Sequence, residues 1–173
     1  YFNPIDQAGP PRFARDALES GVDGLIMVDL PPEEDDELCD PARTAGLHWV
    51  RLVTPTSDEK RLKQVLRNSS GFIYYVSIAG ITGTQSATAG AVDQAVTTLR
   101  QHTDLPIAVG FGINTADQVR QTGEIADGAV VGSAIIREIE ENLDDSGAAK
   151  PELLDRVSRL VSGLAGGLGT ERL

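Results

Sequence analysis

Short apolar segments alternate with longer segments of helical periodicity, and this alternation constrains the fold more than any other feature of the sequence. Each apolar segment has about five or six residues, most of them branched or aromatic. Nearly continuous apolar runs of this length are typical of parallel strands that are covered on both faces. We therefore predict buried parallel strands at residues 24–29, 48–53, 72–77, 106–110 and 128–132.

Apolar residues recur at helical spacing between and after these segments. We predict helices over residues 12–20, 33–45 and 152–164, one that Ser57 caps, and one with an apolar stripe over residues 91–99. Thr115 and Gln118 have the spacing of a capping box, so a further helix is expected to begin there. The glycines after residue 165 indicate a frayed tail.

The predicted strands follow one another every 22 to 34 residues or so, which is the spacing of βαβ units. An open doubly wound sheet and a (β/α)₈ barrel both have this spacing. Asp23-Gly24 and Asp127-Gly128 each stand directly before a strand. This repeat favours an α/β fold of the (β/α)₈ type, also called a TIM barrel.

The charge balance excludes some classes of partner. Acidic residues number 26 against 15 basic ones, for a net charge of −11. This charge argues against binding to nucleic acid or to an anionic membrane, because like charges repel. The single cysteine, Cys39, has no partner for an internal disulfide, so we expect a cytoplasmic protein.

Glycines and small hydroxyls dominate the ends of the last three predicted strands, in Ser77–Gly83, Gly110–Gly112 and Gly132-Ser133. In parallel α/β folds, ligands gather at the carboxyl ends of the strands. Backbone N–H groups can approach an anion closely where no Cβ intervenes. These loops therefore favour phosphate binding, although each alone is also compatible with an ordinary strand-to-helix turn.

Other polar residues have structural interpretations. Asp29 ends a predicted strand without a partner carboxylate, so we expect it to hold backbone N–H groups rather than to act in catalysis. The acidic run 33–37 is expected to form a solvated first helical turn, where it offsets the helix dipole. His48 and His102 have no ligand at metal-binding spacing, and we predict no metal site. The small-residue segment 78–90 is either a surface loop or a mobile lid.

Five motifs together resemble the tryptophan synthase alpha chain family: YFNP, GVDGLIMVDLPPEE, FIYYVSIAGITG, PIAVGFGI and ADGAVVGSAII. The resemblance runs from the first residue to about Asn142. It implies a (β/α)₈ barrel lyase that cleaves indole-3-glycerol phosphate into indole and glyceraldehyde 3-phosphate. It also implies an alpha2-beta2 complex with a beta chain, and pyridoxal phosphate is expected only in that beta chain.

The resemblance assigns expected roles to individual residues. It implies phosphate binding by Gly83, Gly112, Gly132 and Ser133, an indole pocket lined by Tyr1, Tyr74 and Phe111, a lid threonine at Thr82, and a beta-chain interface at Asn3, Asp29 and Pro31.

The resemblance also implies that the family's catalytic glutamate and aspartate precede the motif at Tyr1. We therefore expect no catalytic residue among these 173 and interpret the chain as a fragment that lacks the acid–base pair. Residues 1–165 would be the C-terminal two-thirds of one barrel domain, from the end of strand 3 to strand 8, and 166–173 a Gly-rich tail. The alternatives are a non-catalytic fragment that binds only phosphate or a beta-chain partner, and a related barrel that acts on another sugar phosphate.

Overall fold

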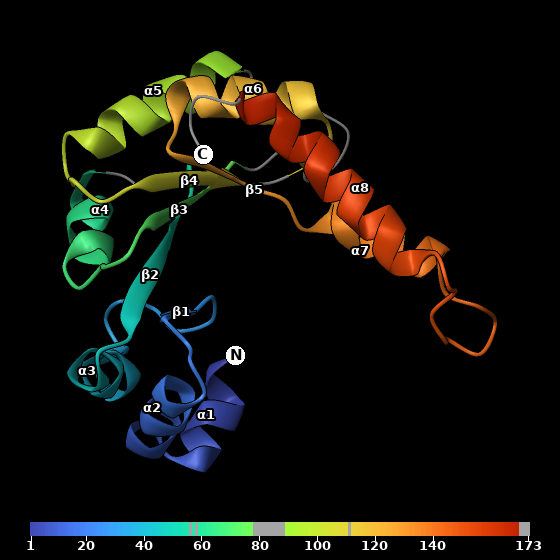
Figure 1. Ribbon diagram of the computed structural model, residues 1–173. Coiled ribbons are helices and arrows are strands. Elements are labelled where there is room, and N and C mark those ends of the chain that lie inside the picture. Colours follow the sequence, from blue (N-terminus) through green and yellow to red (C-terminus); the bar gives the residue numbers. More distant parts are fainter. Residues whose placement is uncertain (56, 58, 78–88, 111, 170–173) are drawn as a thin grey trace. The chain divides into compact units, whose positions relative to one another are not determined.

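The computed structural model describes residues 1–55, 57, 59–77, 89–110 and 112–169 of the 173. Helices and strands alternate through most of this range (Figure 1). In chain order the elements are α1 (Phe2–Ala8), α2 (Pro10–Glu19), β1 (Gly24–Ile26), α3 (Asp36–Ala45), β2 (His48–Val53), α4 (Glu59–Leu66), β3 (Ile73–Val76), α5 (Ala89–Arg100), β4 (Ile107–Gly110), α6 (Ala116–Ile125), β5 (Gly128–Val130), α7 (Ser133–Glu141), α8 (Leu153–Ala165) and the 3₁₀ helix η1 (Gly166–Leu168).

The chain divides into two compact units. Unit 1 comprises Tyr1–Val76 and Ala95–Ile107, and unit 2 comprises Ser77–Gln94 and Ala108–Leu173. In the described range, no helix combines the length and the apolar character that crossing a membrane requires.

Unit 1 is built on three parallel strands, with β2 between β1 and β3. Gly24 pairs with His48, and a Cβ added to Gly24 would lie 2.9 Å from the His48 Cβ. This close approach explains why a glycine begins β1. The core of the unit includes Leu38, Trp49 and Ile73, none of which is exposed to a measurable extent.

Burial on both faces, which the apolar runs predict, fails at β1. The side chain of Ile26 is 46% exposed and that of Val28, just beyond the strand, is 57% exposed. β1 stands first in the strand order, so only one of its edges is paired within the described residues. The prediction is wrong here because a continuous apolar run does not show whether both faces are covered in the same chain.

Unit 2 contains β5 and all of β4 except Ile107; the two strands are parallel and pair Gly110 with Val130. The capping box predicted at Thr115 is confirmed, since the Thr115 hydroxyl oxygen accepts from the Gln118 N–H and the Gln118 side chain accepts from the Thr115 N–H. Helix α7 packs against α8, and Arg156 of α8 lies 3.5 Å from Glu138 of α7.

The predicted α/β alternation is confirmed, with differences at the ends of the elements. The strand at 48–53 has the predicted bounds, whereas the other four are shorter because strand pairing stops before the apolar run does. Helix α1 was not predicted, and α2 begins at Pro10 rather than at residue 12. A proline is well suited to the first turn of a helix, where its missing N–H costs no hydrogen bond.

The glycines after residue 165 predict a frayed tail, and this prediction is wrong for the described part of the tail. Residues Gly166–Leu168 form η1, which packs against α6. A Cβ added to Gly167 would lie only 2.1 Å from the Ala116 carbonyl oxygen. The glycine therefore permits a close backbone approach between η1 and the start of α6.

We expect Gly167→Ala to lower the free energy of unfolding by about 1–3 kcal/mol, the usual cost of overpacking. Gly163→Ala is the matched control, because a Cβ there meets nothing within 4 Å. It should raise stability by roughly 0.5 kcal/mol through helix propensity. Urea denaturation followed by far-UV circular dichroism measures both, and equal effects would contradict the close packing at Gly167.

Candidate functional site

The starts of three loops meet at one edge of unit 2. The Gly110–Val130 pair sets the ends of β4 and β5 side by side. Ser77 joins them, since its N–H and its hydroxyl both donate to the Gly110 carbonyl oxygen, at 3.1 and 3.2 Å. The carboxyl ends of parallel strands are the usual ligand-binding edge of an α/β fold. The segments that follow Ser77, Gly110 and Val130 therefore begin at the expected binding edge.

The loop between β4 and α6 turns at a glycine. Gly112 is exposed and has a φ of +72°, a conformation that L side chains rarely adopt. A Cβ at this position would meet nothing within 4 Å, so the backbone faces open space. The N–H groups of Asn114 and Thr115, farther along, both donate to the Gln118 Oε1, at 2.8 and 3.2 Å.

Helix α7 begins at the end of the neighbouring strand without a side-chain cap. Its N-cap residue is Gly132, and Ser133 is the first helical residue; both are exposed. The Ile135 and Ile136 N–H groups bond to the Gly132 carbonyl, whereas the first N–H groups of a helix have no partner within it. Uncapped N–H groups, the helix dipole and the Ser133 hydroxyl can together hold an anion.

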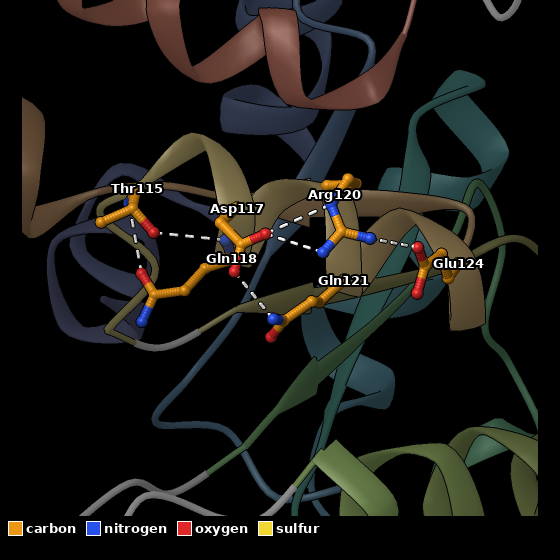
Figure 2. Close-up of polar contacts among 6 residues, drawn as sticks. All are labelled: Thr115, Asp117, Gln118, Arg120, Gln121 and Glu124. Carbon is orange, nitrogen blue, oxygen red and sulfur yellow. Dashed lines mark hydrogen bonds and ion pairs between the residues drawn. The ribbon is translucent and has the colours of Figure 1, made fainter.

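Exposed polar side chains bind one another along α6 (Figure 2). The Asp117 carboxylate accepts from the Arg120 guanidinium at 2.7 and 3.2 Å and from the Gln121 amide at 2.8 Å. Arg120 also donates to Glu124 at 2.5 Å. Figure 2 shows Asp117 directed along the helix toward Arg120, whereas Gln118 turns back to Thr115.

A second region of interest lies in unit 1, around the loop that follows β1. The Asp29 carboxylate accepts a hydrogen bond of 2.9 Å from the Phe2 N–H, at the start of α1. Asp29 thus holds a backbone N–H group, although the group belongs to Phe2 rather than to the turn itself. Tyr1, Asn3 and Pro31 are all exposed.

A groove of about 360 Å³ separates this loop from the end of β2 and from α4. Leu30, Pro31 and Pro32 line one wall, and Leu52, Thr54 and Val65 are among the residues on the other side. An exposed ion pair between Arg61 and Glu33 joins α4 to the loop. The groove therefore has a mixed apolar and polar lining, with one ion pair between the loop and α4.

Beneath the groove lies a buried ion pair that sequence reasoning missed. The Asp35 carboxylate pairs with the Arg51 guanidinium, and the same oxygen accepts from the Trp49 Nε1–H at 3.1 Å. Arg51 also lies 5.3 Å from the centre of the Trp49 ring, which adds a cation–π contact. Within the described residues the Asp35 Oδ1 and the Arg51 Nε have no hydrogen-bond partner.

The expectation of a solvated turn over residues 33–37 is therefore wrong for Asp35, which is fully buried. Asp35 is the N-cap residue of α3, yet its side chain makes no capping hydrogen bond because it is directed at Arg51 instead. The available signal was Arg51 itself, because a charged residue in an apolar strand requires a buried partner of opposite charge.

Burial changes the acidity of two groups in unit 1. It lowers the pKa of Arg51 to about 10, which still leaves the guanidinium charged at neutral pH. It raises the pKa of the Cys39 thiol to about 11, so this buried cysteine is protonated and unreactive at neutral pH.

The other predicted site residues are placed as follows. Gly112, Gly132 and Ser133 belong to the two loops of unit 2, whereas Tyr74 is half-buried in β3 of unit 1. Gly83, Thr82 and Phe111 lie outside the described residues. Among the residues that are described, no three histidine, cysteine or carboxylate groups come close enough to hold a metal ion.

Comparison with known proteins points to one family. The model of the family described as "Tryptophan synthase alpha chain" matches residues 1–163. Similar solved structures include tryptophan synthase subunit alpha from Legionella pneumophila (34% identity, 97% of this chain covered, TM-score 0.80). They also include tryptophan synthase from M. tuberculosis (31% identity, 100% of this chain covered, TM-score 0.81). A third is tryptophan synthase subunit alpha from Campylobacter jejuni (30% identity, 95% of this chain covered, TM-score 0.81).

The chain spans 60% of the length of the Legionella and M. tuberculosis chains and 62% of the Campylobacter chain. These likenesses confirm the predicted fold class, that of part of an α/β barrel.

We expect Arg51→Met to lower the free energy of unfolding by about 3–5 kcal/mol, because it leaves the Asp35 carboxylate buried without a counter-charge. Arg61→Met is the matched control, since its ion pair with Glu33 is about 40% exposed on both sides. Its expected cost is below about 1 kcal/mol.

The double variant Asp35→Asn/Arg51→Met should recover part of the loss, because it removes both charges and keeps an acceptor for Trp49. Urea denaturation of the four proteins, followed by circular dichroism, measures these differences. Similar losses for the two arginine variants would show that the buried pair has no special role.

Proposed function

The chain belongs to the tryptophan synthase alpha chain family, and from this premise we propose that its residues are part of a lyase that cleaves indole-3-glycerol phosphate into indole and glyceraldehyde 3-phosphate. Residues 1–165 would form the C-terminal two-thirds of one barrel domain in that enzyme.

The observation that carries the proposal is the pair of adjacent glycine loops at the ends of β4 and β5. Gly110 and Val130 are paired, so Gly112 on one loop and Gly132 and Ser133 on the next leave from neighbouring points of unit 2. Phosphate sites in (β/α)₈ barrels are frequently built from the loops after the last two strands and a short helix. We propose that Gly83 adds a further backbone group to this phosphate site.

The chemistry of the cleavage divides into a binding part and a proton-transfer part. As the carbon–carbon bond breaks, indole C3 takes up a proton and the glycerol hydroxyl loses one, which requires a positioned acid and base. In our reading no residue of the 173 matches the family's glutamate and aspartate. We propose that the 173-residue chain supplies the phosphate-binding part of the site and does not contain the acid–base pair.

The remaining roles follow from the family and are proposed for matching residues. Tyr1, Tyr74 and Phe111 would line the indole pocket, and Thr82 would help to close the site. Asn3, Asp29 and Pro31 would face the beta chain of an alpha2-beta2 complex. Pyridoxal phosphate would be held by that partner alone. We also propose a cytoplasmic location, because the only cysteine of the sequence is free and buried.

The experiment that tests this proposal uses the chain with indole-3-glycerol phosphate. We expect saturable binding of inorganic phosphate and of indole-propanol phosphate, and no sustained release of indole. Absence of phosphate binding would contradict the proposed site. Sustained release of indole would show that an acid–base pair is present among these residues after all.

Ser133→Ala should raise the dissociation constant for inorganic phosphate roughly tenfold, because it removes one hydrogen bond to a charged ligand. The matched control is Ser158→Ala, which deletes an exposed hydroxyl on α8. Isothermal titration calorimetry measures both. An unchanged constant for Ser133→Ala would exclude this hydroxyl from the phosphate site.

A further inference from the structure

We propose that Gln118 is a positioning residue for the phosphate loop, and that its lack of charge allows an anion to bind there. The inference rests on the proposed function, because it takes the loop that contains Gly112 as part of the phosphate site. In this inference the neutral Gln118 side chain fixes the conformation of the loop and adds no negative charge to it.

The first step concerns the hydrogen bonds of Gln118. Its Oε1 accepts from the Asn114 N–H at 2.8 Å. It also accepts from the Thr115 N–H at 3.2 Å, and the Gln118 N–H donates to the Thr115 hydroxyl oxygen at 3.2 Å (Figure 2). One side chain thus holds two consecutive residues of the loop against the first turn of α6. Rotation of the loop about Asn114 would break both of these contacts.

The second step concerns the N–H groups that stay available to a ligand. The Asn114 and Thr115 N–H groups donate to Gln118. The nearest upstream N–H groups that Gln118 does not bind, in the described part of the loop, are those of Gly112 and Ile113. Gly112 is the residue whose backbone faces open space. The contacts of Gln118 therefore keep the far end of the loop fixed while the end near Gly112 stays accessible.

The third step concerns charge. A capping box takes glutamate or glutamine at this position, and a negative charge in the first turn also interacts favourably with the helix dipole. A glutamate would thus cap α6 at least as well, in a sequence with 26 acidic residues. It would also set a carboxylate against the loop that is proposed to bind phosphate.

The neighbouring acid, Asp117, shows how α6 accommodates a charge at this end. Its carboxylate is bound by Arg120 and Gln121 and directed along the helix. Gln118, whose side chain binds the loop, carries a neutral amide where Asp117 carries a carboxylate. Two residues of extended chain, from Gly112 to Asn114, span about 7 Å at most. A carboxylate at residue 118 would therefore lie within the Debye length of about 30 Å at 0.01 M ionic strength from a phosphate held at Gly112.

The decisive variant is Gln118→Glu, which keeps the acceptor and changes one charge. We expect its unfolding temperature to equal or exceed that of the parent chain. Its dissociation constant for inorganic phosphate should be about tenfold higher at low ionic strength, and this difference should shrink in 0.5 M sodium chloride. Phosphate binding is measured by calorimetry, and unfolding by circular dichroism at 222 nm.

Two further variants separate charge from loop order. Gln118→Ala removes the acceptor, so it should lower the unfolding temperature and weaken phosphate binding by a factor that salt does not restore. Gln121→Glu adds the same charge to α6 beyond the loop. It loses a hydrogen bond to Asp117 and sets two carboxylates side by side. Because the added charge lies farther from the loop, its phosphate affinity should fall clearly less than that of Gln118→Glu.

Each outcome decides between the inferences. If Gln118→Glu binds phosphate as well as the parent chain does, the role of the neutral side chain is overturned while the proposed function stands. A loss of stability in Gln118→Glu as large as that in Gln118→Ala would overturn the premise that a carboxylate caps this helix. If the parent chain binds no phosphate, the proposed function fails, and this inference fails with it.

Discussion

Parallel pairing of strands is the constraint on which the candidate site depends. Strands that run in the same direction bring their carboxyl ends to one edge, and the chain must return to the opposite edge before each new strand. In unit 2 this rule sets the end of β4 beside the end of β5, through the pairing of Gly110 with Val130. Two loops that are 20 residues apart in sequence can therefore act on one ligand.

The two helices that follow these strands begin in different ways, although both have N–H groups without partners in the helix. In α6, the side chains of Thr115 and Gln118 satisfy such groups. In α7, the N-cap residue is a glycine and no side chain caps the helix. Side-chain capping therefore stabilises the start of α6, whereas the start of α7 has no such cap.

Local patterns in the sequence were sufficient to predict the parts of the structure that depend on neighbouring residues. The capping box at Thr115 and the strand at His48–Val53 are examples, since spacing and apolar character alone determine them. Asp35 and Arg51 show where such reasoning fails. They are 16 residues apart, and Asp35 belongs to an acidic run that resembles an ordinary first turn. Only tertiary contact pairs it with an arginine in a neighbouring strand.

The same distinction applies to the candidate site. The glycine loops after β4 and β5 leave from neighbouring points because parallel pairing places the two strand ends together. The proposed indole pocket depends instead on Tyr1 and Tyr74 of unit 1 and on Phe111, whose mutual distances no spacing in the sequence determines. Exposure at β1 was unpredictable for a related reason, since it depends on which surfaces the rest of the fold covers.

The division into two units has a consequence for optical studies of this protein. Trp49, Tyr1, Tyr74 and Tyr75, which are all the tryptophan and tyrosine residues of the sequence, belong to unit 1. The indole of Trp49 is buried and bonded to a carboxylate, so its emission reports on the Asp35–Arg51 pair. Tryptophan emission and the tyrosine and tryptophan bands of the near-ultraviolet spectrum therefore follow unit 1, whereas unit 2 contains neither tryptophan nor tyrosine.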